Sequence, residues 1–240
     1  NRNNTRTDIQ TMFQVLEDND VIASNFISKI KVLKAPPKRN KSYSEDKLER
    51  IYSFLKETDP NLLLFIKFVS YNFLRPIEVC RLKVEDIDLK EQKLTVKAKN
   101  KLVKEKIIPN ILMEELSFLS NCDGNDFLFT PKGIPSSWEA TDDNRRDYFT
   151  KRFKEVKDLF TKKAKEGDKD YFELNSEYGI YSFRHTFITK IYREMRKTLT
   201  PFETKSRLLL ITGHNTMNAL EQYLRDIDAE LPEDYSDLIK

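Results

Sequence analysis

Apolar side chains recur every three or four residues along most of the chain, which is the spacing of helices with one buried face. The pattern predicts helices over 7–20, 24–33, 44–57, 60–73, 113–119, 142–166, 181–195, 204–213 and 217–226. The stretch PNLLLFIKFVSYNF, residues 60–73, is apolar almost throughout. We therefore expect this helix to be buried at the centre of a domain.

Only KLTVKAKNKLVKEKIIP, residues 93–109, has a convincing strand pattern, with two short β-prone runs around a lysine-rich tip. The fold class predicted is mainly α with a small antiparallel β-sheet or hairpin, an α+β fold. The stretch KAPPKRNKSY sets two prolines among lysines and polar residues, which is typical of a linker. We predict a helical unit over 1–34, a linker over 35–43 and a larger domain over 44–240.

The composition is that of a globular protein, with 39% apolar residues in 240. No run approaches the roughly eighteen apolar residues of a membrane span, and NRNNTRTDIQ lacks the pattern of a signal peptide. The first residue, Asn, suggests a fragment of a longer protein. Cys80 and Cys122 have no metal or redox spacing. They are typical of ordinary buried cysteines in a reduced cytoplasm, so we predict a cytoplasmic protein.

The net charge is only +3, but the charges are unevenly distributed. Lysines crowd residues 97–106, a basic run covers 145–165, and the end from 221 to 237 is mostly acidic. Such a distribution is compatible with a DNA-binding face and equally with solvated helix surfaces.

Two segments carry candidate phosphate-binding arginines. In NFLRPIEVC, Pro76 suits a first helical turn and places Arg75 at a helix N-terminus, where free amides favour an anion. Glu78, three residues on, can hold the guanidinium. In YSFRHTFIT, Tyr181, Arg184 and His185 share one helix edge. The alternatives are a plain surface ion pair for the first segment and half-buried packing for the second.

The second of only two histidines, His214, precedes Tyr223 by nine residues in ITGHNTMNALEQYLRD. On an unbroken helix this spacing is about two and a half turns, so the two side chains would point to opposite sides. Gly213 can end one helix, and Asn215 or Thr216 can cap the next. We therefore expect His214 at a joint and Tyr223 on the helix that leaves it.

The sequence lacks the residue patterns that several kinds of enzyme chemistry require. The histidines and carboxylates form no recognisable metal set, and neither a P-loop, a dinucleotide glycine pattern nor a serine elbow is present. We expect no metal and no cofactor. The chemistry that remains is a reaction at a phosphate, in which cationic side chains bind the phosphate and a hydroxyl group acts as the nucleophile.

The order of five features along the chain resembles that of the tyrosine recombinase, or phage integrase, family. These features are Arg75 with Glu78, a hairpin lysine, RH in SFRHTF, GH in ITGHN, and Tyr223. The hairpin stretch KLVKEKIIP is similar to the family pattern K-x-x-K-E-R-x-x-P and selects Lys101, with Lys99 as its nearest rival. The resemblance extends from Arg75 to Tyr223 and implies the catalytic-domain fold of that family.

The resemblance also implies a chemistry. Tyr223 is expected to attack a DNA phosphodiester and form a 3′-phosphotyrosine link, which a 5′-hydroxyl later reverses. Arg75 and Arg184 are expected to bind the non-bridging oxygens, and Lys101 to act as the general acid. His185 and His214 are expected to partner the phosphate and the phenol. Tyr181 departs from the family, because histidine is common at that position.

The family implies partners as well. It implies a double-stranded DNA recombination site and a tetramer on DNA, with this fragment alone possibly a monomer, and no membrane. Residues 1–34 resemble the last helices of the family's core-binding domain. The acidic tail, with Leu231, Tyr235, Leu238 and Ile239, is expected to pack on its own domain or on a neighbouring protomer. A recombinase or integrase of a bacterial, phage or other mobile element is the first hypothesis; a type IB topoisomerase-like enzyme and an inactive DNA-binding remnant are the alternatives.

Overall fold

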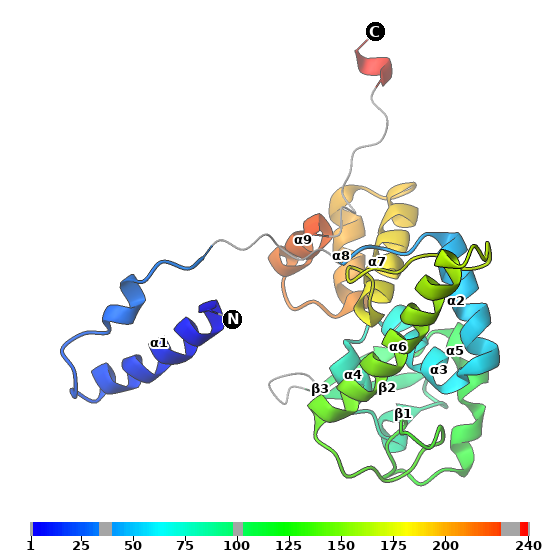
Figure 1. Ribbon diagram of the computed structural model, residues 1–240, viewed down its shortest axis with the longest axis horizontal. Coiled ribbons are helices and arrows are strands. Elements are labelled where there is room, and N and C mark those ends of the chain that lie inside the picture. The colour runs from blue at the N-terminus through cyan, green and yellow to red at the C-terminus, as the bar shows by residue number, and fades with distance from the viewer. Residues whose placement is uncertain (1, 34–39, 98–102, 227–235, 240) are drawn as a thin grey trace. The chain divides into compact units, whose positions relative to one another are not determined.

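The computed structural model describes residues 2–33, 40–97, 103–226 and 236–239. The chain divides into two compact units, Asn1–Lys38 and Arg39–Lys240 (Figure 1). Within the described residues no helix is long and apolar enough to cross a membrane.

The first unit is one helix with a segment that returns along it. Helix α1 (Arg2–Asp18) is followed by η1 (Phe26–Lys29), a single 3-10 turn. The Arg6 side chain donates to the Ile30 carbonyl at 2.6 Å, and the Phe13 and Phe26 rings meet edge-on at 5.0 Å. The prediction of a helix over 24–33 is therefore wrong beyond this single turn, because the Ser28 and Ile30 carbonyls accept from the Arg6 side chain instead of from amides of their own segment.

Residues 40–43, predicted to belong to a linker, are part of the second unit. The Lys41 amide donates to the Glu177 carbonyl at 3.1 Å, and the Tyr43 amide donates to Thr186 Oγ1 at 2.8 Å. The Tyr43 ring stacks on Phe183 with centroids 4.3 Å apart. Burial of this ring fixes the segment despite its polar neighbours.

The second unit is mainly helical. Its helices are α2 (Glu45–Thr58), α3 (Pro60–Tyr71), α4 (Pro76–Val79), α5 (Asn110–Met113), α6 (Asp142–Lys165), α7 (Ile180–Arg196), α8 (Pro201–Thr212) and α9 (Met217–Asp226), with 3-10 turns η2 (Val84–Asp86), η3 (Glu114–Asn121) and η4 (Ser236–Leu238). As predicted, α3 is buried at the centre and is capped by Asp59, which accepts from the Leu62 amide at 3.0 Å. The helix predicted over 113–119 is mostly the 3-10 helix η3.

The predicted hairpin is present as part of a three-stranded antiparallel sheet. Its strands are β1 (Ile87–Asp88), β2 (Lys93–Lys97) and β3 (Val103–Ile107), in the order β1-β2-β3, with Thr95 opposite Glu105. Leu94 and Val96 of β2 are buried, so one face of the sheet joins the core. The short strand β1 was not predicted. The hairpin tip lies outside the described residues.

Two apolar clusters hold the second unit together. The larger contains α2, α3, much of α6 and the sheet, with Phe65 stacked on Phe149 at 4.2 Å. The smaller joins α7, α8 and α9 through Ile188, Leu208 and Leu224. Helices α7, α8 and α9 lie side by side (Figure 1). The smaller cluster therefore fixes the helices that carry the candidate nucleophile.

Candidate active site

Arg75 lies at the start of α4, as predicted. Pro76 is the first helical residue, and the Arg75 amide donates to Glu78 Oε2 at 2.7 Å. Arg75 Nη1 donates to the other carboxylate oxygen at 3.0 Å. Half of the Arg75 side chain, 52%, remains exposed. Glu78 thus fixes the guanidinium while leaving one edge free for an anion.

Arg184 lies in α7 and is buried, with an exposure of 2%. Its Nη1 donates to the Tyr181 hydroxyl at 2.9 Å, and its Nη2 approaches the Thr212 carbonyl at 3.4 Å. Nε finds no partner among the described residues. The Tyr181 hydroxyl also interacts with Arg75. Tyr181 therefore links the two arginines.

The turn between α8 and α9 has the predicted geometry. Gly213 ends α8 in the left-handed conformation, with φ of 72°, which glycine adopts without steric cost. The Thr216 hydroxyl caps α9 by accepting from the Ala219 amide at 3.2 Å. Because the helix is broken here, the His214 and Tyr223 rings lie 5.1 Å apart, centroid to centroid.

Tyr223 is enclosed by the other candidate residues. Its ring stacks on His185 at 4.8 Å with an interplanar angle of 16°. The Arg184 guanidinium carbon lies 5.5 Å from the ring centroid. The phenolic oxygen is buried and has no hydrogen-bond partner among the described residues. Burial raises the pKa of this phenol well above its usual value, so the group is held as the neutral phenol.

Both histidines are neutral at physiological pH. Burial, with Arg184 nearby, lowers the pKa of His185 and of His214 to about 4. Thr212 donates its hydroxyl to the Leu208 carbonyl at 2.8 Å, so its oxygen accepts from His214 Nδ1 at 2.6 Å. This assigns the proton of His214 to Nδ1 and makes Nε2 the acceptor nitrogen.

Strand β3 adds two lysines that the sequence reasoning did not select. Lys104 and Lys106 line a narrow pocket together with Arg75, Glu78, Arg184 and Gly213. Lys104 Nζ donates to the Gly213 carbonyl at 2.9 Å and also bonds to the Asn215 side chain. The predicted general acid, Lys101, and its rival Lys99 lie outside the described residues. Strand alternation was the signal for Lys104 and Lys106, because both fall on one face of β3.

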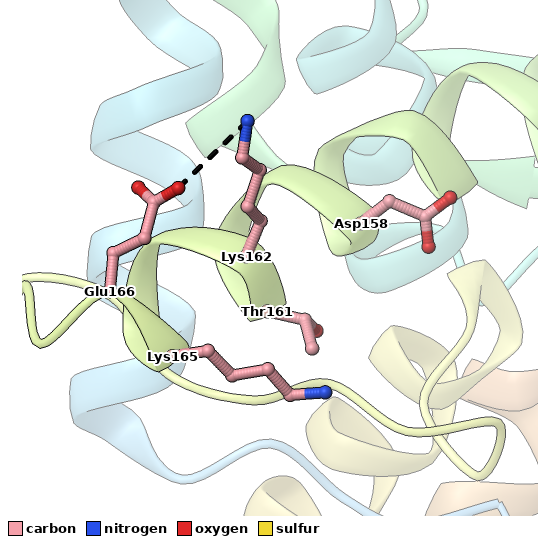
Figure 2. Close-up of a pocket in the computed structure, with 5 residues that line it drawn as sticks. All are labelled: Asp158, Thr161, Lys162, Lys165 and Glu166. Carbon is pink, nitrogen blue, oxygen red and sulfur yellow. Dashed lines mark ion pairs between the residues drawn. The ribbon is translucent and has the colours of Figure 1, made fainter.

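The other basic run, on α6, is not a continuous positive face. Arg145 is buried against the Phe127 ring at 3.6 Å, and Arg152 pairs with Asp59 at 2.5 Å. The hollow over the C-terminal end of α6 is lined by residues of both signs, and Lys162 pairs with Glu166 at 3.9 Å (Figure 2). None of the candidate catalytic residues lines this hollow. Within the described ranges no group of three or more His, Cys, Asp or Glu side chains could hold a metal ion.

Comparisons with known proteins identify the family of this chain. The sequence model of the phage integrase family matches residues 41–199. The chain belongs to the phage integrase family. Membership of this family makes the chain a site-specific recombinase of the tyrosine type. No curated protein sequence matches the chain.

Solved structures share the integrase fold. The Tn1549 transposon integrase, in complex with a circular intermediate DNA, matches with a TM-score of 0.62 and 15% identity over 99% of this chain and 76% of that one. A λ integrase dimer bound to a COC′ core site matches with a TM-score of 0.65 and 15% identity over 98% of this chain and 61% of that one. The XerA recombinase matches with a TM-score of 0.51 and 18% identity, covering 98% and 73%.

The family match ends before the α8–α9 turn. Residues 41–199 include Arg75, Arg184 and His185 but not His214 or Tyr223. The assignment of the last two therefore depends on their position beside Arg184 and His185 in this integrase-family structure.

Proposed function

We propose that this chain cleaves and rejoins DNA strands through a 3′-phosphotyrosine link at Tyr223. One observation carries the proposal: the Tyr223 ring lies against His185, His214 and Arg184, and Tyr181 connects Arg184 to Arg75. A phenol beside two guanidinium groups and two neutral imidazoles has the components of metal-independent phosphoryl transfer.

In the proposed reaction, the Tyr223 oxygen forms a bond to phosphorus as the bond from phosphorus to the 5′-oxygen breaks. The leaving strand departs as a 5′-hydroxyl after gaining a proton. Arg75 and Arg184 bind the non-bridging oxygens and stabilise negative charge in the transition state. The phosphoester energy is kept in the tyrosyl ester, so a 5′-hydroxyl of the same or another strand can reverse the step.

The phenol proton needs an acceptor, because a free tyrosine has a pKa of about 10. A neutral imidazole can accept it. His214 Nδ1 is bonded to Thr212, so Nε2 is its acceptor nitrogen, and the His185 ring stacks on the phenol ring. We assign the base role to these two histidines. Tyr181 is not assigned this role, because its hydroxyl accepts a hydrogen bond from Arg184. Lys101 remains the predicted general acid.

The buried phenol also implies a movement. Tyr223 must leave its enclosed position to reach a phosphate, and α9 carries it. The turn at Gly213 is the nearest break in the helices. We propose that DNA binding shifts α9 and exposes the hydroxyl.

We propose a double-stranded recombination site of a mobile element as substrate and a tetramer as the active assembly. The λ integrase has been solved as a tetramer bound to a Holliday junction, and its structure matches this chain with a TM-score of 0.54 and 16% identity over 89% of this chain and 58% of that one. Residues 1–34 are proposed to be the end of a core-binding domain. The tail, whose Ile239 is 76% exposed, is proposed to pack on its own or a neighbouring protomer.

The test uses a pool of duplexes with randomised sequence around a nick. After cleavage, the short strand with the 5′-hydroxyl dissociates, so the protein stays attached to the 3′-phosphate. We expect the unmodified chain to form a covalent adduct that survives denaturation, and the captured duplexes identify the site. Tyr223→Phe should abolish the adduct, and Tyr181→Phe should retain it.

Other outcomes separate the alternatives. Loss of the adduct in Tyr181→Phe alone would move the nucleophile to Tyr181. Relaxation of supercoiled plasmid without recombinant products would indicate a topoisomerase-like enzyme. Binding of duplexes without any adduct would indicate an inactive DNA-binding remnant.

A further inference from the structure

Strand β3 directs two lysines toward the candidate active site. Val103, Glu105 and Ile107 are exposed, whereas Lys104 and Lys106 are partly buried. Alternate side chains of a strand share one face, so these two lysines lie on the same side of β3. Both line the pocket that contains Arg75 and Arg184.

The surroundings of the two ammonium groups differ. Lys104 is bonded to the α8–α9 turn. The Lys106 ammonium has neither a hydrogen bond nor an ion pair with any other described residue. Its Nζ would lie 3.6 Å from a Cβ added to Gly213, and 6.0 Å from the centroid of the Phe73 ring. Lys106 is therefore a cation in the pocket that pairs with no anionic side chain within the described part of the chain.

The pocket holds more positive than negative charge. The charged groups that face Lys106 are Arg75 and Glu78 from α4, Arg184 from α7 and Lys104 from β3, with His214 on the adjoining turn. Burial, followed by the charge of Arg184, lowers the pKa of Lys106 to about 7. An ammonium in such a place is stabilised by an incoming anion, because buried charge without a counter-ion is costly.

We propose that Lys106 binds the scissile phosphate as a third cation beside Arg75 and Arg184. This inference rests on the proposed function and adds a phosphate ligand to it. The role differs from that of a general acid, because Lys106 would retain its proton and contact a non-bridging oxygen. Phosphate binding should then take up a proton and weaken as the pH rises above 7, a range in which arginine stays charged and His214 is already neutral.

The first experiment measures the single-turnover rate of adduct formation on a duplex captured by the unmodified chain. Lys106→Met should slow the reaction roughly a hundredfold, as expected for loss of a preorganised charge at the reacting phosphate. Lys106→Arg should restore much of the rate. Lys93→Met is the matched control, because Lys93 is an exposed lysine of the same sheet, and its rate should stay within about twofold of the unmodified rate.

Two modified duplexes separate a phosphate ligand from a proton donor. A methylphosphonate at the scissile position lacks the negative charge, so Lys106→Met should differ little from the unmodified protein on this substrate. A 5′-bridging phosphorothiolate releases a thiolate that needs no proton. Lys106→Met should remain slow on it, and rescue would overturn the proposal in favour of general-acid catalysis. Equal rates for Lys106→Met and the unmodified chain on ordinary DNA would also overturn it.

A reaction-independent measurement separates this proposal from the proposed function. Inorganic phosphate, added at constant ionic strength, should raise the thermal unfolding midpoint of the unmodified chain and of Lys93→Met but not of Lys106→Met. If the unmodified chain forms no adduct and this difference persists, the proposed reaction fails and the phosphate site stands. If phosphate raises all three midpoints equally, the Lys106 assignment fails.

Discussion

The two histidines of this integrase-family chain are buried beside arginines, and this burial changes their titration. The pKa of each is lowered to about 4 from an ordinary value near 6.5. Because protonation is easier in the unfolded chain, the contribution of the two histidines to the free energy of unfolding should be constant above about pH 6.5 and fall as the pH drops toward 4.

Nuclear magnetic resonance can follow this directly, because only two imidazole signals are present. Both should remain those of neutral histidine at pH 6 and titrate with midpoints near 4. Urea unfolding from pH 7 to pH 4.5 should show the accompanying loss of stability. A histidine signal with a midpoint near 6.5 would contradict the burial described here.

Tyr181 provides a second prediction for a single residue. Tyr181→Phe removes the oxygen that accepts from buried Arg184 at 2.9 Å. Since a hydrogen bond to a charged group contributes about 1.5–3 kcal/mol, adduct formation should slow by about ten- to a hundredfold without being lost. Tyr148→Phe is a matched control, because the Tyr148 hydroxyl accepts from Arg152 at 3.1 Å on α6. Equal effects of the two substitutions on the adduct rate would rule out a specific role for Tyr181.

Much of the candidate site could be predicted from single residues, because their spacing along the chain determines which side chains lie together. Tyr181, Arg184 and His185 fall within one helical turn, and the left-handed Gly213 brings His214 back toward Tyr223. The family pattern drew attention to Lys101, whereas the lysines in the described pocket are Lys104 and Lys106. Their position depends on how the sheet packs beside α4 and α7, which no local pattern contains.

Between elements, Lys104 joins strand β3 to the α8–α9 turn. Its bond to the Gly213 carbonyl satisfies a group that α8 leaves without a helical partner. Lys104→Met should destabilise the protein by about 1–2 kcal/mol. It should also speed hydrogen–deuterium exchange over residues 213–223, because the turn loses its attachment to the sheet.

Lys67→Met is the matched control for the contact between Lys104 and the α8–α9 turn. Lys67 pairs with Glu115 and joins α3 to η3. Its loss should lower stability by a similar amount while leaving exchange over 213–223 unchanged. If Lys104→Met does not alter that exchange, the contact does not hold the turn.

Elements were predicted well where their own sequence is decisive. Helix α3 begins at Pro60 as predicted, whereas α8 begins at Pro201, three residues before its predicted start at Thr204. The predictions for 24–33 and 113–119 failed because short apolar segments take the conformation that their neighbours allow. The position of Tyr43 could not be predicted for a similar reason, since its packing on Phe183 is a contact between residues far apart in sequence.

At the scale of the whole molecule, stability resides in the second unit. Both apolar clusters consist of residues from 43 onward, whereas α1 buries no residue. A fragment of residues 39–240 should therefore unfold cooperatively, with a melting temperature within about 2 °C of that of the full chain. Calorimetry of both proteins measures this. A decrease of more than about 5 °C would show that the first unit contributes to the core.

The enclosed phenol sets a minimum size for the substrate. The exposed edge of Arg75 can be reached by any small phosphate ester, but the Tyr223 oxygen cannot be reached while α9 stays in place. Displacing α9 costs the contacts of Leu220 and Leu224, which are fully buried. A free nucleotide makes too few contacts to supply that energy, and a long duplex held at many phosphates supplies it easily. Under the proposed reaction, cleavage is therefore restricted to long duplexes.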